Sequence, residues 1–211
     1  MTIEETRAAI LSSEDFVMEE FEKLRTLYKL KTEIRFAQER QDHVDTESVA
    51  EHVYAMHALA AYFRPLENLA NDWDRELITT MIQFHDIDEI ETGDTIGYLK
   101  TETLRTLESE AQVRVIAGLP DTLQSAVKAA LQVYDDRITE EAKFVKAIDK
   151  IEPNFHLYND QGKEILKRLS TTSVEHNSIK DPHMVDFPYI RRFHHVLRDR
   201  MYKEGFFSDS P

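Results

Sequence analysis

The 211-residue chain contains no cysteine, and it has only 5 glycines and 6 prolines. The absence of cysteine excludes disulfides, thiolate metal sites and cysteine nucleophiles. Because β-rich folds need many turn residues, the scarcity of glycine and proline favours helices. The sequence therefore predicts an all-α protein, long enough for one domain with a buried core.

Positive charge is also scarce. The chain has 26 lysine and arginine residues against 40 aspartate and glutamate residues, which gives a net charge of −14. No basic run stands out, so we expect neither nucleic acid nor a membrane surface as a partner. No apolar run approaches the ~18 residues that span a bilayer, and the charged start MTIEETRAAI lacks the apolar segment of a secretory signal. We therefore expect a cytoplasmic protein.

Apolar residues recur at helical spacing along most of the chain. The pattern predicts helices over residues 16–30, 48–63, 74–85, 101–118, 123–134, 139–156 and 190–201, with polar loops over 32–47 and 170–186. No repeat or low-complexity tract is present. We therefore expect one domain over 1–211, with a core at about 15–160 and a C-terminal loop and helix, 161–211, appended to it.

Side chains that can bind a metal accompany the apolar stripes of three of these helices. They are His52, the pair His85-Asp86, and Asp149. Taken alone, a histidine on an apolar face is roughly twice as often a core residue as a ligand, and a helical aspartate can simply form a salt bridge. Taken together, two imidazoles and two carboxylates suit one divalent Mn, Co, Fe, Zn or Mg ion rather than copper. Such a set leaves positions for water and substrate.

Two further carboxylates, Glu89 and Asp94, follow in the segment HDIDEIETGD (85–94). Buried carboxylates are unfavourable unless they are paired or bound to a metal. A carboxylate whose pKa is raised by burial can also take or give a proton near neutral pH. Because neither residue is needed for a four-ligand set, their presence favours a catalytic metal site over a purely structural one.

Three strings in this order resemble the HD-domain superfamily of metal-dependent phosphohydrolases, in particular the YfbR-like bacterial 5′-deoxynucleotidases and their eukaryotic relatives. The strings are TESVAEH (46–52), FHDIDEIETGD (84–94) and EAKFVKAIDKIE (141–152), and the similarity covers about residues 20–160. The resemblance implies a helical bundle with a central metal cleft, in which His52, His85, Asp86 and Asp149 bind one metal. It further implies that Glu89 acts on the attacking water or the leaving oxygen, that Asp94 orients the water or a ribose hydroxyl, and that the protein is a homodimer.

The substrate is less well specified by this resemblance. In the family an Arg-Trp pair before the first motif histidine contacts substrate; here Arg35-Phe36 occupies a similar place, and Arg40 is a second candidate. The resemblance predicts release of phosphate from nucleoside 5′-monophosphates. Other HD hydrolases act on nucleoside triphosphates, cyclic nucleotides or (p)ppGpp, and the few clustered lysines and arginines in the sequence argue against a multiphosphate substrate.

Two other interpretations remain open at this stage. A di-iron oxygenase on the same scaffold would need more histidines after His85-Asp86, and none occurs before His156. A non-catalytic, metal-stabilised helical binding protein would explain the altered Arg35-Phe36 pair and the unassigned residues 170–211. Glu89 and Asp94 argue against this second alternative.

Overall fold

The computed structural model describes residues 1–36, 38–40, 46–96 and 100–210. Within these ranges every regular element is helical, apart from one isolated antiparallel bridge between Ile34 and Ser48. The predicted all-α class is therefore confirmed. None of the described helices combines the length and the hydropathy that a membrane crossing requires.

Helices follow one another with mostly short connections. In chain order they are α1 (Ile3–Ser12), α2 (Glu14–Thr26), η1 (Leu27–Lys31), α3 (Val49–Glu67), α4 (Arg75–Phe84), α5 (Glu89–Thr92), α6 (Glu102–Ala117), α7 (Asp121–Asp136), α8 (Glu140–His156), α9 (Asp160–Arg168), α10 (Ser173–Ser178), η3 (Asp181–His183) and α11 (Pro188–Lys203). Side-chain caps explain several of the starts, because Ser13, Ser48, Asp74, Thr101 and Thr139 each accept a backbone hydrogen bond from the first turn.

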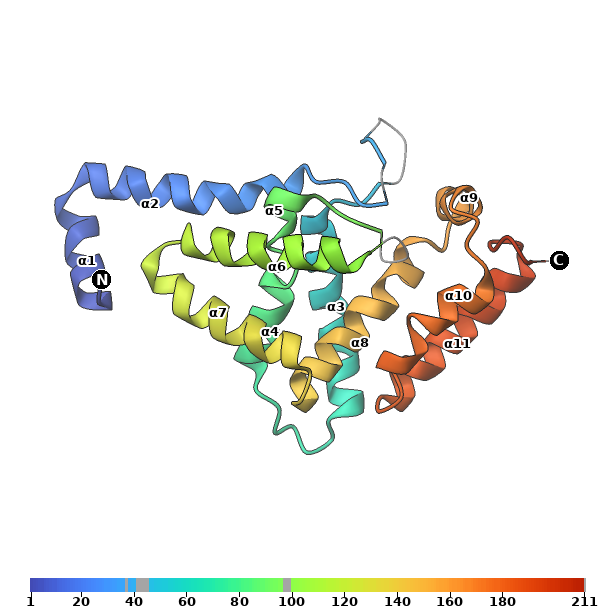
Figure 1. The fold of residues 1–211 in the computed structure, drawn as a ribbon. Coiled ribbons are helices and arrows are strands. Elements are labelled where there is room, and N and C mark those ends of the chain that lie inside the picture. Colours follow the sequence, from blue (N-terminus) through green and yellow to red (C-terminus); the bar gives the residue numbers. More distant parts are fainter. Residues whose placement is uncertain (37, 41–45, 97–99, 211) are drawn as a thin grey trace.

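The centre of the molecule is formed by α3, α4, α7 and α8, with α11 packed on α3 and α8 (Figure 1). Their shared core includes Met56, Phe63, Met81, Ile82, Phe144, Ile148 and Ile151, all with no exposed surface. Burying each such side chain contributes roughly 1.5–3 kcal/mol. A smaller apolar cluster surrounds Ile87 and joins the turn after α4 to α6 and α7. This anchor fixes the backbone of His85 and Asp86, which directly precede Ile87.

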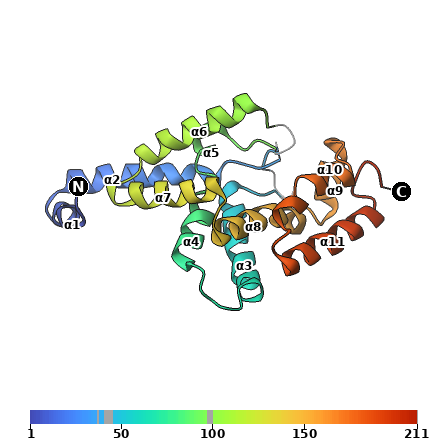
Figure 2. The same ribbon diagram turned by 60° about the horizontal axis from the view of Figure 1, so that its bottom comes forward.

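The two ends of the chain lie at opposite ends of the molecule. Helices α1 and α2 project to one side of the bundle, whereas α9, α10 and α11 pack at the other side (Figures 1 and 2). The predicted helix over 16–30 corresponds to α2 and η1, but α2 has no buried residue. Helix α1 was not predicted, because its few apolar residues form no clear stripe.

The prediction of a long polar loop over 170–186 is wrong in part, since α10 and η3 form there. Thr172 and Glu175 make a capping box at the start of α10, and His176 and Met184 are buried. Helices of one or two turns are too short to show a helical period in the sequence. The predicted loop over 32–47 agrees with the described part of that segment, while residues 37 and 41–45 lie outside the described residues.

A buried polar network fastens the C-terminal helices to α8. Asn154 of α8 contacts His194 Nδ1 through Nδ2 at 2.9 Å and His176 Nε2 through Oδ1 at 2.8 Å. His194 Nε2 lies 3.1 Å from Asn177 Oδ1. Since His194 accepts at Nδ1 and donates at Nε2, it is neutral. Burial and, to a smaller extent, the charge of Lys180 lower the pKa of His194 to about 3.

This neutral histidine makes stability depend on pH. The folded state holds the pKa of His194 at about 3, whereas the unfolded chain has a value of about 6.5. The unfolded chain therefore binds the proton first, so the stabilisation is complete above pH ~6.5 and is lost as the pH falls toward ~3, at up to about 1.4 kcal/mol per pH unit. We expect urea unfolding between pH 7 and pH 4 to show this slope and His194→Gln to flatten it. An identical slope in the variant would contradict the assignment.

Candidate metal centre

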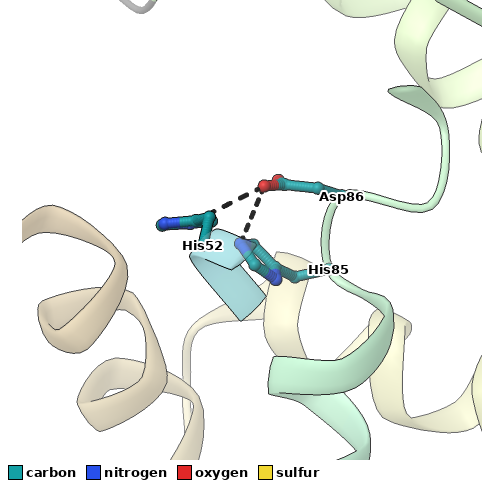
Figure 3. Close-up of side chains that lie close together, drawn as sticks. All are labelled: His52, His85 and Asp86. Carbon is teal, nitrogen blue, oxygen red and sulfur yellow. Dashed lines mark ion pairs between the residues drawn. The ribbon is translucent and has the colours of Figure 1, made fainter. Parts of the chain in front are cut away.

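Three helical segments bring the four predicted ligands together. His52 belongs to the first turn of α3, His85 and Asp86 to the turn after α4, and Asp149 to the middle of α8. Asp86 Oδ2 lies 3.0 Å from His85 Nε2 and 3.8 Å from His52 Nε2 (Figure 3). Asp149 Oδ1 lies 3.7 Å from the same His52 nitrogen. His52, His85 and Asp86 each offer a donor atom within 4.8 Å of the others, close enough to share one ion.

Hydrogen bonds on the far side of each imidazole orient both histidines. His52 Nδ1 lies 2.7 Å from Glu152 Oε2, and His85 Nδ1 lies 3.0 Å from the carbonyl oxygen of Ile82. These acceptors favour a proton on Nδ1 and leave the Nε2 lone pair directed to the centre, as in histidines that bind metals. Within the described residues, both Nε2 atoms are buried without a hydrogen-bond partner. Because buried polar atoms rarely lack a partner, the donor set fits a divalent ion.

Charges around the centre keep both aspartates ionised. Burial by itself would raise the pKa of Asp86, but His85 and His52 hold it below its ordinary value. Burial also opposes ionisation of Asp149, yet Lys146 and Lys150 hold the pKa of that carboxyl well below its usual range. Burial and Arg35 would lower the pKa of His52, whereas Asp149 and Glu152 raise it to about 9. A cation at His52 Nε2 therefore competes with a proton.

A second group of possible ligands, Glu47, His52 and Glu152, lies on the other side of the His52 ring. Its charge is already balanced by the buried Arg35, whose Nη1 lies 2.6 Å from Glu47 Oε2 and 3.3 Å from Glu152 Oε2. We therefore interpret these residues as the support of His52. Sequence reasoning missed both glutamates, although Glu152 follows Asp149 by three residues and so shares its side of the helix.

Glu89 is a buried carboxyl group beside the proposed ligands. Burial raises the pKa of Glu89 well above its ordinary value, and the charges of Asp86 and Asp94 raise it further. Glu89 Oε2 is buried and has no hydrogen-bond partner among the residues described. A carboxyl group whose pKa is raised in this way is a candidate for proton transfer.

Asp94 holds the predicted substrate-binding pair in place. Its Oδ2 accepts a 3.0 Å hydrogen bond from the backbone N–H of Phe36, and its Oδ1 lies 3.6 Å from Arg35 Nε. Phe36 adopts a positive φ of 63° and stacks on His156 with 5.7 Å between ring centroids. Arg40 lies elsewhere: it pairs with Glu51 on the surface at 3.1 Å and is not among the residues that line the cavity at the centre.

This cavity opens beside the ligands and has a volume of about 860 Å³ counted with its open mouth. Asp86, Glu89, Asp94, Asp149, Arg35 and Phe36 line it on one side, and Leu157, Ile165, Leu166 and Leu169 form an apolar wall. Its lysines are Lys100, Lys146, Lys150 and Lys180. The expectation of few clustered cations is therefore wrong. The fold brings these lysines from distant parts of the chain into one cavity, which their positions in the sequence do not show.

Comparisons with known proteins agree with this arrangement. The HD domain family matches residues 27–186, which extends past the expected core boundary at about 160. The fold is similar to that of a predicted metal-dependent phosphohydrolase from Magnetospirillum magnetotacticum, with 23% identity, a TM-score of 0.72, and 92% of this chain and 98% of that chain covered. It is also similar to an HD-domain phosphohydrolase from Listeria innocua, with 20% identity, a TM-score of 0.61, and coverage of 88% and 91%. No curated protein matches the chain by sequence. Since the family match covers most of the chain, this protein belongs to the HD domain family.

Proposed function

We propose that this protein is a metal-dependent phosphohydrolase that releases phosphate from a nucleotide, with nucleoside 5′-monophosphates as the simplest substrates. The observation that carries the proposal is the pair of buried Nε2 atoms, on His52 and His85, that face the carboxylate of Asp86 at the edge of a lysine-lined cavity. His52, His85, Asp86 and Asp149 would hold one Co, Mn, Mg, Fe or Zn ion. When bound, such an ion supplies hydroxide near neutral pH and screens the phosphate charge.

The chain's own residues provide the other functions that this reaction needs. Lys146 and Lys150 lie 2.8 Å and 3.1 Å from Asp149 Oδ2, so they place positive charge where a phosphate group would approach the ligands. Glu89, whose pKa is raised by burial, would act in proton transfer, either to the leaving oxygen or from the attacking water. Asp94 orients Arg35 and Phe36 at the cavity, where they would contact the rest of the nucleotide.

Support for a phosphate ester as substrate also comes from the similar structures, both of which are described as phosphohydrolases. Among the alternative HD substrates, those that carry several phosphates, nucleoside triphosphates and (p)ppGpp, gain weight from the four lysines of the cavity. A purely structural metal site would not explain why Glu89 is buried beside the proposed ligands with an oxygen that has no hydrogen-bond partner among the described residues.

We further propose that the protein is a homodimer that pairs through α2. Val17, Phe21, Leu24 and Tyr28 form an exposed apolar stripe along α2 and η1, with 40%, 46%, 42% and 62% of their surfaces accessible. Acidic residues begin α2, and basic residues occupy its last turn and η1. In an antiparallel pair around a twofold axis, each acidic end would face a basic end, so the surface is complementary to itself.

The first prediction concerns the metal. Divalent ions added to chelator-treated protein should raise its unfolding temperature, and Glu152→Gln should weaken the binding about 10–100-fold because it loosens His52. Titration calorimetry measures this affinity. Glu140→Gln, on the exposed side of the same helix, is the matched control and should bind as the wild type does. Equal affinity in all three proteins would contradict the role of Glu152.

The second prediction concerns catalysis. Phosphate release should be measured with 5′-mono-, di- and triphosphates, ribo- and deoxyribo-, in the presence of each candidate metal. We expect Asp86→Ala to abolish turnover, and Glu89→Gln to lower kcat by roughly 10²–10⁴-fold while metal binding is retained. Glu91→Gln, two residues away on the exposed side of α5, should keep wild-type kcat. Metal-loaded, folded protein that hydrolyses none of these compounds would refute the proposed function.

The third prediction concerns the dimer. Phe21→Glu places a charge in the middle of the apolar stripe and should convert the protein to a monomer, as measured by analytical ultracentrifugation. Val113→Glu changes an apolar residue of α6 that is 65% exposed and should leave the dimer intact. A wild-type protein that sediments as a monomer at all concentrations would exclude this interface.

A further inference from the structure

Lys180 is a buried amine in the wall of the cavity. It lies between α10 and η3, and only 4% of its surface is exposed. Its Nζ donates a 2.7 Å hydrogen bond to the carbonyl oxygen of Lys150. The residue lines the same cavity as Asp86 and Asp149. Within the described part of the chain, no carboxylate oxygen lies within ion-pairing distance of this Nζ.

The other lysines of the cavity each have a carboxylate partner. Lys146 and Lys150 contact Asp149, and Lys100 lies 2.8 Å from Glu108 Oε1. An unpaired buried cation is strongly unfavourable. Accordingly, burial and, to a smaller extent, the charge of Lys150 lower the pKa of Lys180 to about 7. A neutral donor such as glutamine could also donate a hydrogen bond to the Lys150 carbonyl oxygen. The hydrogen bond to α8 therefore does not explain why a lysine occupies this position.

The position of Lys180 shows which part of a ligand it would meet. Its Nζ is bonded to the backbone of the residue that follows Asp149, so Lys150 and Lys180 extend the positive charge from the ligand set into the cavity. Lys146, whose Nζ lies 2.8 Å from Asp149 Oδ2, places positive charge at the proposed ligand set. Lys180 has no such carboxylate partner among the described residues and lines the same cavity as the apolar residues Leu157, Ile165, Leu166 and Leu169, so together with Lys150 it offers a place for a second anionic group.

We infer that the substrate of this site is a phosphate ester that carries a second phosphate group, which Lys180 and Lys150 bind while the first lies at the metal centre. This inference rests on the proposed function and names its substrate class, a nucleoside diphosphate or bisphosphate. In the reaction, a water oxygen forms a bond to phosphorus at the metal centre and the bond from phosphorus to the leaving oxygen breaks. The proton from water passes to the leaving oxygen, and the phosphate at Lys180 stays on the product. Lysine suits this task because its ammonium group binds phosphate as a point charge.

The decisive experiment compares wild type and Lys180→Met on a 5′-monophosphate, a 5′-diphosphate and a 3′,5′-bisphosphate of one nucleoside. We expect wild-type kcat/KM to be at least tenfold higher for one of the two-phosphate substrates, and the variant to raise KM for that substrate at least tenfold. The KM for the monophosphate should change less than twofold. Lys128→Met, an exposed lysine on α7, should leave all three values unchanged. The better of the two substrates shows whether the phosphates are joined directly or through the sugar.

Two further measurements separate this inference from the proposed function. Pyrophosphate binding to protein without added metal should be at least tenfold weaker in Lys180→Met, and this result would support the second phosphate site even if no substrate were turned over. The variant should also unfold at the wild-type temperature or above, because an unpaired buried charge is removed. The inference is overturned if the variant and the wild type have equal kinetics and bind pyrophosphate equally. A lower unfolding temperature of the variant, with kinetics and pyrophosphate binding unchanged, would likewise assign Lys180 a structural role.

Discussion

The hydrogen bond between Glu152 and His52 Nδ1 is the contact on which the candidate site depends. It is fully buried, it joins α8 to the first turn of α3, and it directs the other nitrogen of His52 to Asp86 and Asp149. Arg35 supports this arrangement, since its largely buried guanidinium pairs with the carboxyl groups of both Glu47 and Glu152. Removal of one member of such a buried set leaves an uncompensated charge, which costs roughly 3–5 kcal/mol. The metal centre and the segment that carries Arg35 and Phe36 are therefore parts of one electrostatic unit.

The two halves of the cavity come from different parts of the chain and serve different purposes. Helices α3 and α8 and the turn after α4 carry the proposed metal ligands, Glu89 follows Asp86 at the start of α5, and the large apolar core holds these elements in place. The C-terminal helices supply the apolar wall and Lys180, and they are fixed to α8 through Asn154 and its two histidine partners. Under the proposed function, this division would place the reacting end of a ligand against the central helices and its opposite end against the C-terminal segment.

The sequence predicts well those features that depend on long periodic patterns and on short strings. The long central helices belong to this class, and so does the convergence of His52, His85, Asp86 and Asp149, because each of these residues lies beside an apolar stripe whose direction is fixed by burial. Helix α10 was missed because its six residues are too few to show a period, and α9 was missed although it buries Ile165 and Leu166. The lysine cluster was missed because Lys100, the two α8 lysines and Lys180 are brought together only by the packing of distant parts of the chain. Arg35 was found as a candidate, but its buried pairing with Glu47 and Glu152 follows from contacts between residues more than ten positions apart.

The most direct test of the account is the position of a metal in crystals of the protein grown or soaked with Mn or Co, located by anomalous scattering. The account predicts one ion bonded to Nε2 of His52, Nε2 of His85 and a carboxylate oxygen of Asp86, with Asp149 contributing through Oδ1. An ion between Glu47, Glu152 and His52 Nδ1 would contradict the assignment of Arg35 and Glu152 as the support of His52. If the crystals show no ion at either place and calorimetry detects no ion uptake in solution, the metal centre itself is refuted.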